Sequence, residues 1–193
     1  MQHSSDIELL SKFQREISRV VVGAEEQTKH LIATLLSGGH ILIEDRPGTG
    51  KTTLAKAVAK ALQADFKRVQ MTPDLLPSDI TGGMVFLPDL GTLEFRAGPI
   101  FTDLLLADEL NRAAPRTQSA LLEAMAEKQT SIDGKTYPLG EQFTVIATVN
   151  PVDSHGVQPL PEAELDRFLC SFSIGYPTPE DEIAILNSQQ REH

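Results

Sequence analysis

The feature that most constrains the fold is a glycine-containing loop between an apolar run and a helix-forming segment. Residues 40–43 read His-Ile-Leu-Ile and predict a buried strand, and residues 51–62 predict a helix. The junction, residues 44–53, reads Glu-Asp-Arg-Pro-Gly-Thr-Gly-Lys-Thr-Thr. A strand, a glycine loop and a helix start in this order form a P-loop, because backbone N–H groups and the positive end of the helix dipole then point at one phosphate.

Each residue type in this loop has a physical role. Gly48 and Gly50 permit the tight turn, Lys51 places a cation on the β- and γ-phosphates, and Thr52 offers a hydroxyl to Mg²⁺. The usual first glycine is replaced by Asp45, a residue type that tolerates unusual backbone angles better than most. The alternative is a chance Gly-Lys-Thr, which the flanking strand and helix disfavour. The expected nucleotide-binding residues of the loop are Asp45, Arg46, Pro47, Gly48, Thr49, Gly50, Lys51, Thr52 and Thr53.

The composition sets the size and class of the protein. With 193 residues, 40% of them hydrophobic, the chain can form one full domain and a fragment of a second. The net charge of −10 gives no broad basic footprint for nucleic acid, although a local patch can hide within an acidic total. No apolar run is long enough to cross a bilayer, and residues 1–20 do not read as a signal peptide, so the expected location is the cytosol. The single cysteine, Cys170, excludes an internal disulfide and predicts a buried strand thiol rather than a reactive nucleophile.

Apolar periodicity predicts strands that alternate with helices. Helices are expected at 6–21, with Asp6 as the N-cap, and at 24–37, 51–62, 115–128, 162–168 and from about Glu180. Strands are expected at 40–44, 66–70, 104–107, 143–149 and 169–174, with hairpin-like pieces at 84–87 and 92–95 and around Asp133-Gly134. This alternation predicts a three-layer α/β P-loop NTPase domain with a mainly parallel sheet.

Two adjacent acids follow the apolar strand at 104–107. In the Walker B arrangement Asp108 holds Mg²⁺ through its water shell, and Glu109 orients and deprotonates the attacking water. Both acids would lie at the carboxyl edge of the sheet, where open α/β folds bind their ligands. We therefore expect Thr52 and Asp108 at the metal and Glu109 as a catalytic residue. The alternative is a strand followed by a solvated acidic turn.

Two further polar residues come after predicted strands. Asn150 ends the strand at 143–149 and can lie beside the γ-phosphate, although Asn-Pro is also a common turn pair. Arg167 lies beyond that strand, where it can reach the γ-phosphate of a neighbouring subunit and stabilise transition-state charge. Such a role acts in trans and implies a ring. The alternative for Arg167 is an ion pair with Glu164 or Asp166.

In combination these motifs resemble the AAA+ ATPases and, more specifically, the MoxR family. The resemblance covers roughly residues 20–185. The segments that carry it are 44–53, Thr72–Gly82, Phe95–Phe101, Ala107–Ala113, Thr117–Met125 and Leu165–Phe168.

The resemblance implies a hexameric ring that binds ATP/ADP and Mg²⁺ and remodels or matures client proteins, often with a von Willebrand factor A domain partner. It implies that Val22 and Gly23 lie near the adenine base and that the inserts at 84–95 and 131–142 face the substrate or the pore. It also divides the chain into an α/β subdomain, residues 1–175, and a linker with the first helix of a lid, residues 176–193. The chain ends at His193, before the position where the family has a second sensor arginine.

Two other functions remain open at this stage. AAA+ proteins related to helicases carry similar inserts, so a nucleic-acid remodeller is one alternative; the acidic total and the lack of clustered Lys or Arg in the inserts argue against it. A nucleotide-gated binding module with little hydrolysis is the other, and the intact Asp108-Glu109 pair argues against that.

Overall fold

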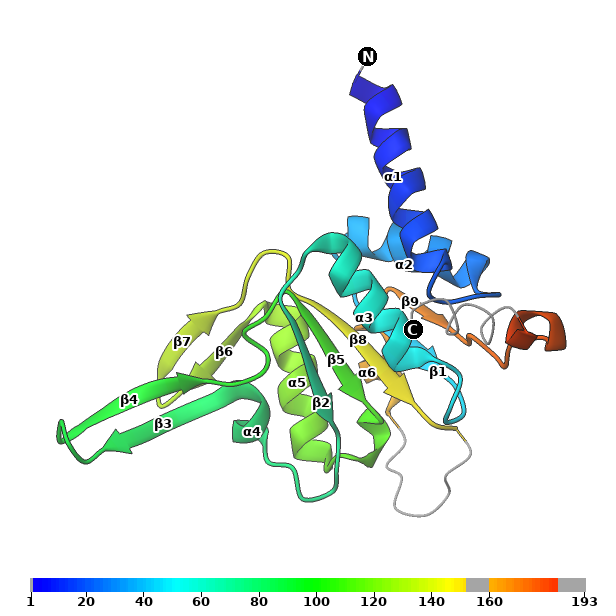
Figure 1. Cartoon of the computed structure of the whole chain (residues 1–193). Helices are drawn as coiled ribbons and strands as arrows, with labels where there is room; N and C mark the ends of the chain where they lie inside the picture. The colour runs from blue at the N-terminus through cyan, green and yellow to red at the C-terminus, as the bar shows by residue number, and fades with distance from the viewer. Residues whose placement is uncertain (1, 152–159, 184–193) are drawn as a thin grey trace.

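A computed structural model describes residues 2–151 and 160–183, with side chains from residue 7 onward. Helices and strands alternate along the chain, as Figure 1 shows. The elements of the α/β core are α1 (Gln2–Ser18), α2 (Glu25–Leu36), β1 (Ile41–Glu44), α3 (Lys51–Leu62), β2 (Phe66–Gln70), β5 (Leu104–Asp108), α5 (Pro115–Glu127), β8 (Thr144–Val149), α6 (Glu162–Leu165) and β9 (Cys170–Phe172). The remaining elements are α4 (Pro77–Thr81), β3 (Gly82–Leu87), β4 (Thr92–Ala97), the 3₁₀ turn η1 (Leu110–Arg112), β6 (Gln129–Ile132) and β7 (Lys135–Pro138).

The central sheet has five strands in the order β2-β5-β8-β1-β9, and every neighbouring pair is parallel. Alternate residues of each strand face opposite sides of the sheet, so each strand contributes side chains to the hydrophobic cores on both faces. Ile41 and Ile43 of β1 pack with α1, α2 and α3, whereas Leu42 packs with α5. The result is the expected three-layer α/β fold, with helices on both faces of a parallel sheet.

The side chain of His40 connects the start of β1 to β8 and to α5. Its Nδ1 accepts a hydrogen bond from the Val145 N–H at 3.0 Å, so its Nε2 donates to the Met125 carbonyl at 3.2 Å. Burial lowers the pKa of His40. The neutral ring is therefore a structural element between β1, β8 and α5.

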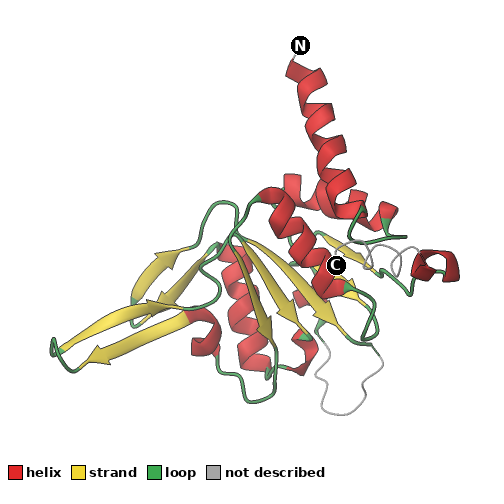
Figure 2. Cartoon of the chain, in the orientation of Figure 1, coloured by secondary structure: helices red, strands yellow, loops and turns green. Residues whose placement is uncertain are grey.

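Two antiparallel hairpins extend from the α/β core (Figure 2). The β3–β4 hairpin leaves α4 at a crossing of two glycines, because a Cβ on Gly82 would meet the backbone of Arg96 and a Cβ on Gly98 would meet the Ile80 carbonyl. The ring of Phe95 in β4 stacks on that of Tyr137 in β7, with centroids 4.0 Å apart. Aromatic packing thus joins the two hairpins.

Most predicted elements are confirmed, and the exceptions are informative. Helix α1 begins at Gln2, so Asp6 lies inside it and is not its N-cap. The apolar stripe of α1 is buried only toward its end: Ile17 is fully buried, whereas Ile7 is 65% exposed. Cys170 lies in a strand as expected, but it is only half-buried, because β9 is the edge strand. Among the residues described, no helix has both the length and the apolar character needed to cross a membrane.

Candidate nucleotide site

Most of the predicted site residues come together at one edge of the sheet. Strand β1 leads into the P-loop, β5 ends at Asp108, and β8 is followed by Asn150. The parallel register aligns these ends, with Glu44 of β1 opposite Val149 of β8 and Asp108 of β5 opposite Gln70 of β2. The loop, the acid pair and the asparagine therefore occupy the carboxyl edge, where doubly wound sheets bind ligands.

The P-loop has the backbone of a phosphate cradle. Gly48 and Gly50 adopt φ of +86° and +87°, a region that favours glycine, and no atom lies within 4 Å of a Cβ built on either. Gly50 is also the N-cap of α3, so the helix begins at Lys51 with its N–H groups directed toward this open space. Asp45, by contrast, does not have a positive φ. The predicted reason for tolerating aspartate there, its ease with unusual angles, was therefore wrong.

Lys51 is held at the loop by neutral partners. Its Nζ donates to the carbonyls of Asp45 at 3.0 Å and Arg46 at 2.6 Å. Burial lowers the pKa of Lys51, and the carboxylates of Asp45, Asp108 and Glu109 act in the opposite direction. The ammonium thus lies within electrostatic range of the acid pair at the same edge of the sheet.

Asp108 is held by hydrogen bonds from neighbouring strands. Its Oδ1 accepts from the hydroxyl of Thr148 at 2.7 Å, and its Oδ2 accepts from the Arg68 guanidinium at 2.6 and 3.1 Å. Thr148 is fully buried and also accepts from the Glu109 N–H at 2.8 Å. One hydroxyl of β8 therefore positions both acids.

Glu109 has an uncommon backbone conformation, with φ of +59° in the left-handed region. Its carboxylate accepts from Gln70 Nε2 at 3.0 Å and from Arg112 Nη1 at 2.9 Å. A non-glycine residue in this region carries strain that recurs at functional sites. This left-handed conformation turns the chain from β5 into η1 at Glu109 itself.

Asn150 is 5% exposed at the end of β8. Its carbonyl accepts from the Asn111 side-chain amide at 3.1 Å, which ties the end of β8 to η1. The Oδ1 atom of Asn111 is buried and has no hydrogen-bond partner within the described chain.

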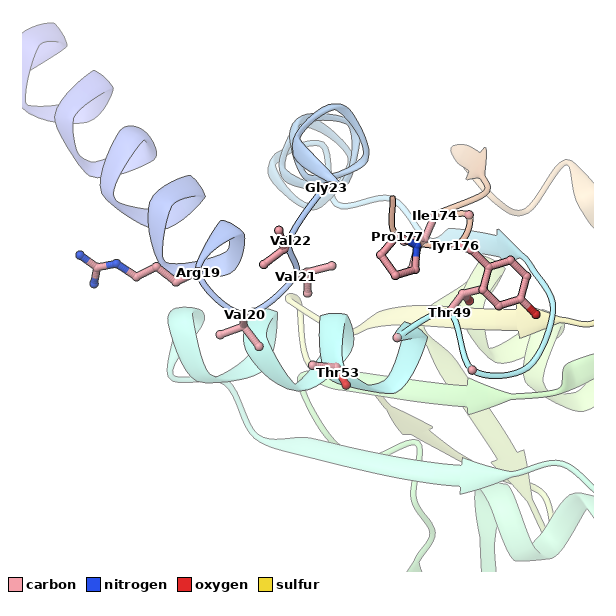
Figure 3. Close-up of a pocket in the computed structure, with 13 residues that line it drawn as sticks. Arg19, Val20, Val21, Val22, Gly23, Thr49, Thr53, Ile174, Tyr176 and Pro177 are labelled. Carbon is pink, nitrogen blue, oxygen red and sulfur yellow. The ribbon is translucent and has the colours of Figure 1, made fainter. Parts of the chain in front are cut away.

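A cavity of about 390 Å³ opens beside the P-loop. Figure 3 shows three groups of residues around it: the segment after α1, the P-loop with the start of α3, and the segment after β9. The lining residues are Arg19, Val20, Val21, Val22, Gly23, Gly48, Thr49, Gly50, Thr53, Ile174, Gly175, Tyr176 and Pro177. The residues predicted near an adenine base, Val22 and Gly23, thus share one cavity with the phosphate loop.

The donor set fits a metal ion that arrives with a phosphate ligand. No cluster of three or more His, Cys, Asp or Glu side chains able to hold a metal exists among the described residues. Thr52 and Asp108 alone leave most positions around a Mg²⁺ ion to water and phosphate oxygens, as is usual for this ion. The open cradle at Gly48 and Gly50 is the complementary place for the phosphates.

Comparison with known proteins decides the family. A family profile described as "ATPase family associated with various cellular activities (AAA)" matches residues 40–170. The chain belongs to the AAA ATPase family. Membership implies nucleotide binding, and the matched range contains the P-loop, the acid pair, Asn150 and Arg167.

Within the AAA family the similarity is to MoxR proteins. The chain is 41% identical to the chaperone MoxR1 of Mycobacterium tuberculosis, over 95% of this chain and 48% of that protein. It is 48% identical to the uncharacterized protein YeaC of Bacillus subtilis, over 100% of this chain and 61% of that protein. A crystal structure of a proposed ATPase from Cytophaga hutchinsonii superposes with a TM-score of 0.81 at 41% identity, over 98% of this chain and 60% of that one. The chain thus spans about half to three fifths of the length of these relatives.

Arg167 is the predicted site residue that lies elsewhere in this AAA domain. It comes before β9, and the Leu169 N–H bonds the His40 carbonyl at the start of β1. Arg167 is therefore at the amino edge of the sheet, a strand length from the P-loop that follows β1. It is exposed, and among the described residues it forms no ion pair with Glu164 or Asp166, the alternative considered above.

Sequence reasoning missed the residues that hold the acids. Arg68, Gln70, Thr148 and Asn111 lie next to the site in space but carry no motif of their own. The available signal was the alternation of side chains along β2, which places Arg68 and Gln70 on the same face of the sheet. The register with β5 then places that face beside Asp108. The end of the helix expected from about Glu180 lies outside the described residues.

Proposed function

We propose that this chain is the ATP-hydrolysing α/β subdomain of a MoxR-type AAA motor. The observation that carries the proposal is that the P-loop, Asn150 and the acid pair Asp108-Glu109 lie at one edge of the sheet, with both acids hydrogen-bonded to the hydroxyl of Thr148. The cavity beside the loop would take the base and ribose of ATP, and ADP would leave from the same place.

Each residue has a role in this proposal. The P-loop amides and Lys51 bind the phosphates, while Thr52 and Asp108 would hold the Mg²⁺ ion that neutralises phosphate charge. Glu109 orients the attacking water and accepts its proton, and Asn150 contacts the γ-phosphate and that water. Gln70 and Arg112 fix the Glu109 carboxylate until it acts.

Arg167 would complete the site of a neighbouring subunit. Strand β1 is four residues long, about 13 Å at 3.3 Å per residue, and Arg167 lies beyond its far end from the P-loop. Because the arginine is remote from its own phosphates and exposed, a head-to-tail ring is the arrangement that supplies it to a γ-phosphate. We propose a hexamer for the full-length protein.

The motor would act on other proteins. The name of the mycobacterial relative, a chaperone, supports the remodelling or maturation of client proteins. We propose a von Willebrand factor A domain protein as a partner, the hairpins β3–β4 and β6–β7 as the surfaces that meet substrate, and residues 176–193 as the linker and first helix of a lid.

Substituting Glu109 by Gln tests the hydrolytic role. The amide keeps the shape but accepts no proton, so ATP binding is retained while turnover falls on the order of 10²-fold or more. Glu123→Gln, the same change on the exposed face of α5, is the matched control and keeps wild-type turnover.

Other results would support the rivals. Equal turnover in wild type and the Gln variant would remove Glu109 as the base, and wild-type binding without turnover would favour a nucleotide-gated module. A DNA titration with a steep salt slope would favour a nucleic-acid remodeller.

A further inference from the structure

Asp45 stands where the usual loop pattern has its first glycine, yet its backbone does not require glycine. Its φ is not positive, and the residue is only 6% exposed. A buried carboxylate needs hydrogen-bond partners, so the side chain itself must account for this position.

The carboxylate of Asp45 is bonded to the segment that follows β9. One oxygen, Oδ2, accepts from the Ile174 N–H at 2.6 Å and from the Gly175 N–H at 3.0 Å. Gly175 has φ of +77°, so the chain turns sharply at the point where it is held. The Asp45 carbonyl accepts from Lys51 Nζ at 3.0 Å. A continuous set of hydrogen bonds thus joins the phosphate-binding ammonium to residues 174–175.

The segment held by Asp45 forms one wall of the cavity beside the P-loop. Residues 174–177 line it together with Gly48, Thr49 and Thr53 (Figure 3). Beyond the wall, the chain also lies close to the segment after α1, because a Cβ on Gly23 would meet the carboxylate of Asp181, four residues beyond Pro177. The Tyr176 hydroxyl also donates to the Pro47 carbonyl, at a long 3.4 Å. The wall therefore spans from the P-loop to the segment after α1.

We propose that Asp45 is a positioning residue that fixes the 174–177 wall against the P-loop and so determines how tightly the base and ribose of the nucleotide are held. The proposal rests on the proposed nucleotide-binding function and adds a residue to it. Asp45 touches the wall through Oδ2 and the phosphate cation only through its main chain. Loss of the side chain therefore weakens binding of the base-bearing part of ATP, whereas loss of its charge near Lys51 acts on the phosphates of any ligand alike.

Two ligands separate these contributions. MgATP carries the base, ribose and phosphates, whereas magnesium tripolyphosphate carries the phosphates alone. The dissociation constant of tripolyphosphate divided by that of MgATP therefore measures what the base and ribose contribute. Isothermal titration of the whole 193-residue chain gives both constants. We expect Asp45→Ala to reduce this ratio on the order of 10-fold, because two hydrogen bonds to a charged acceptor are lost.

Two further variants keep the test decisive. Asp45→Asn retains one carbonyl oxygen able to accept from both N–H groups but loses the charge, so its ratio should fall a few-fold, less than in the Ala variant. Glu44→Ala removes the neighbouring carboxylate, which bonds Ser171 across the same pair of strands but does not touch the wall, and leaves the ratio unchanged. If the Ala variant fails to fold, as a thermal melt would reveal, the Asn variant decides, and a wild-type ratio in that variant would then overturn the inference.

The outcomes distinguish this proposal from the proposed function. An equal loss of affinity for both ligands in the Ala or Asn variant would mean that Asp45 acts on the phosphates and would overturn the inference, as would an unchanged ratio in the Ala variant. Wild-type protein that bound neither ligand would overturn the nucleotide site itself, and the inference with it.

Discussion

Arg68 donates two hydrogen bonds to a single oxygen of Asp108, from Nη2 at 2.6 Å and from Nε at 3.1 Å. A cation of the chain itself therefore lies against the carboxylate expected to hold the metal's water shell. The side chain of Asp108 is 10% exposed and that of Arg68 45% exposed, so the pair is partly screened by solvent.

Removing the charge of Arg68 is expected to lower the Mg²⁺ concentration that ATP turnover requires. Positive charge beside Asp108 opposes a divalent cation, so Arg68→Gln should lower the concentration at half-maximal turnover a few-fold. In free energy of Mg²⁺ binding this is about 1 kcal/mol at most for a pair this exposed. A magnesium titration at fixed ATP measures it. Arg68→Lys keeps the charge and serves as the control. A higher requirement in the Gln variant would show that Arg68 mainly orients Asp108.

Replacing Thr148 by Val is expected to damage both stability and turnover. The isosteric change leaves Asp108 Oδ1 and the Glu109 N–H without their shared partner in a fully buried place, at a cost of about 2 kcal/mol in the free energy of unfolding. Urea unfolding and steady-state ATPase assays check the two effects. Thr148→Ser keeps the hydroxyl, so its turnover should stay near wild type, and a Val variant with wild-type turnover would contradict the positioning role.

Mixing two inactive variants tests whether Arg167 acts across subunits. In a ring assembled from equal amounts of Glu109→Gln and Arg167→Ala protein, roughly a quarter of the interfaces pair an intact glutamate with an intact arginine from the neighbour. ATPase activity should therefore reappear on mixing and reach about a quarter of wild type. Activity that stays at the sum of the separate variants would contradict action in trans.

Acid is expected to destabilise the fold through His40. Burial lowers its pKa in the folded state, so the unfolded chain binds the proton more readily. The stabilising contribution is complete above the ordinary histidine pKa of about 6.5 and is lost progressively as the pH falls toward the lower pKa of the folded state. Unfolding free energies measured by urea titration from pH 8 to pH 5 should decline over this window.

A matched pair of variants assigns that slope. His40→Gln should flatten the pH dependence, whatever its effect on stability at pH 8, whereas His30→Gln changes an exposed histidine and should leave the slope as in wild type. A slope that survives in the His40 variant would place the titrating group elsewhere.

The sequence was sufficient to predict the elements that depend on local signals. The P-loop, the β5 strand with its two acids and the β8 strand with Asn150 each combine an apolar run with a short polar ending, and all three occur as expected. Helix α4 was missed because five residues within a proline- and glycine-rich stretch carry too little periodicity. The start of α1 was misplaced because Asp6 offered a plausible cap to a helix that begins earlier.

The contacts within the site depend on tertiary structure and were not predictable in the same way. Pairing Arg68 with Asp108 requires the β2–β5 register, and pairing Asp45 with Gly175 joins residues far apart in sequence across the β1–β9 edge. The sequence marks Asp45 only as a departure from a pattern. Its role becomes apparent once the buried oxygen has two amide partners.

The stack of Phe95 on Tyr137 bears on how movement would travel through the molecule. The β6–β7 hairpin follows α5 directly, and α5 begins just after the turn that carries Arg112, the partner of Glu109. A shift of α5 along its axis would carry β6–β7 with it, and the stacked rings, worth about 1 kcal/mol, would transmit that shift to β3–β4. We therefore expect the two hairpins, although remote in sequence, to move together as one unit whenever α5 shifts.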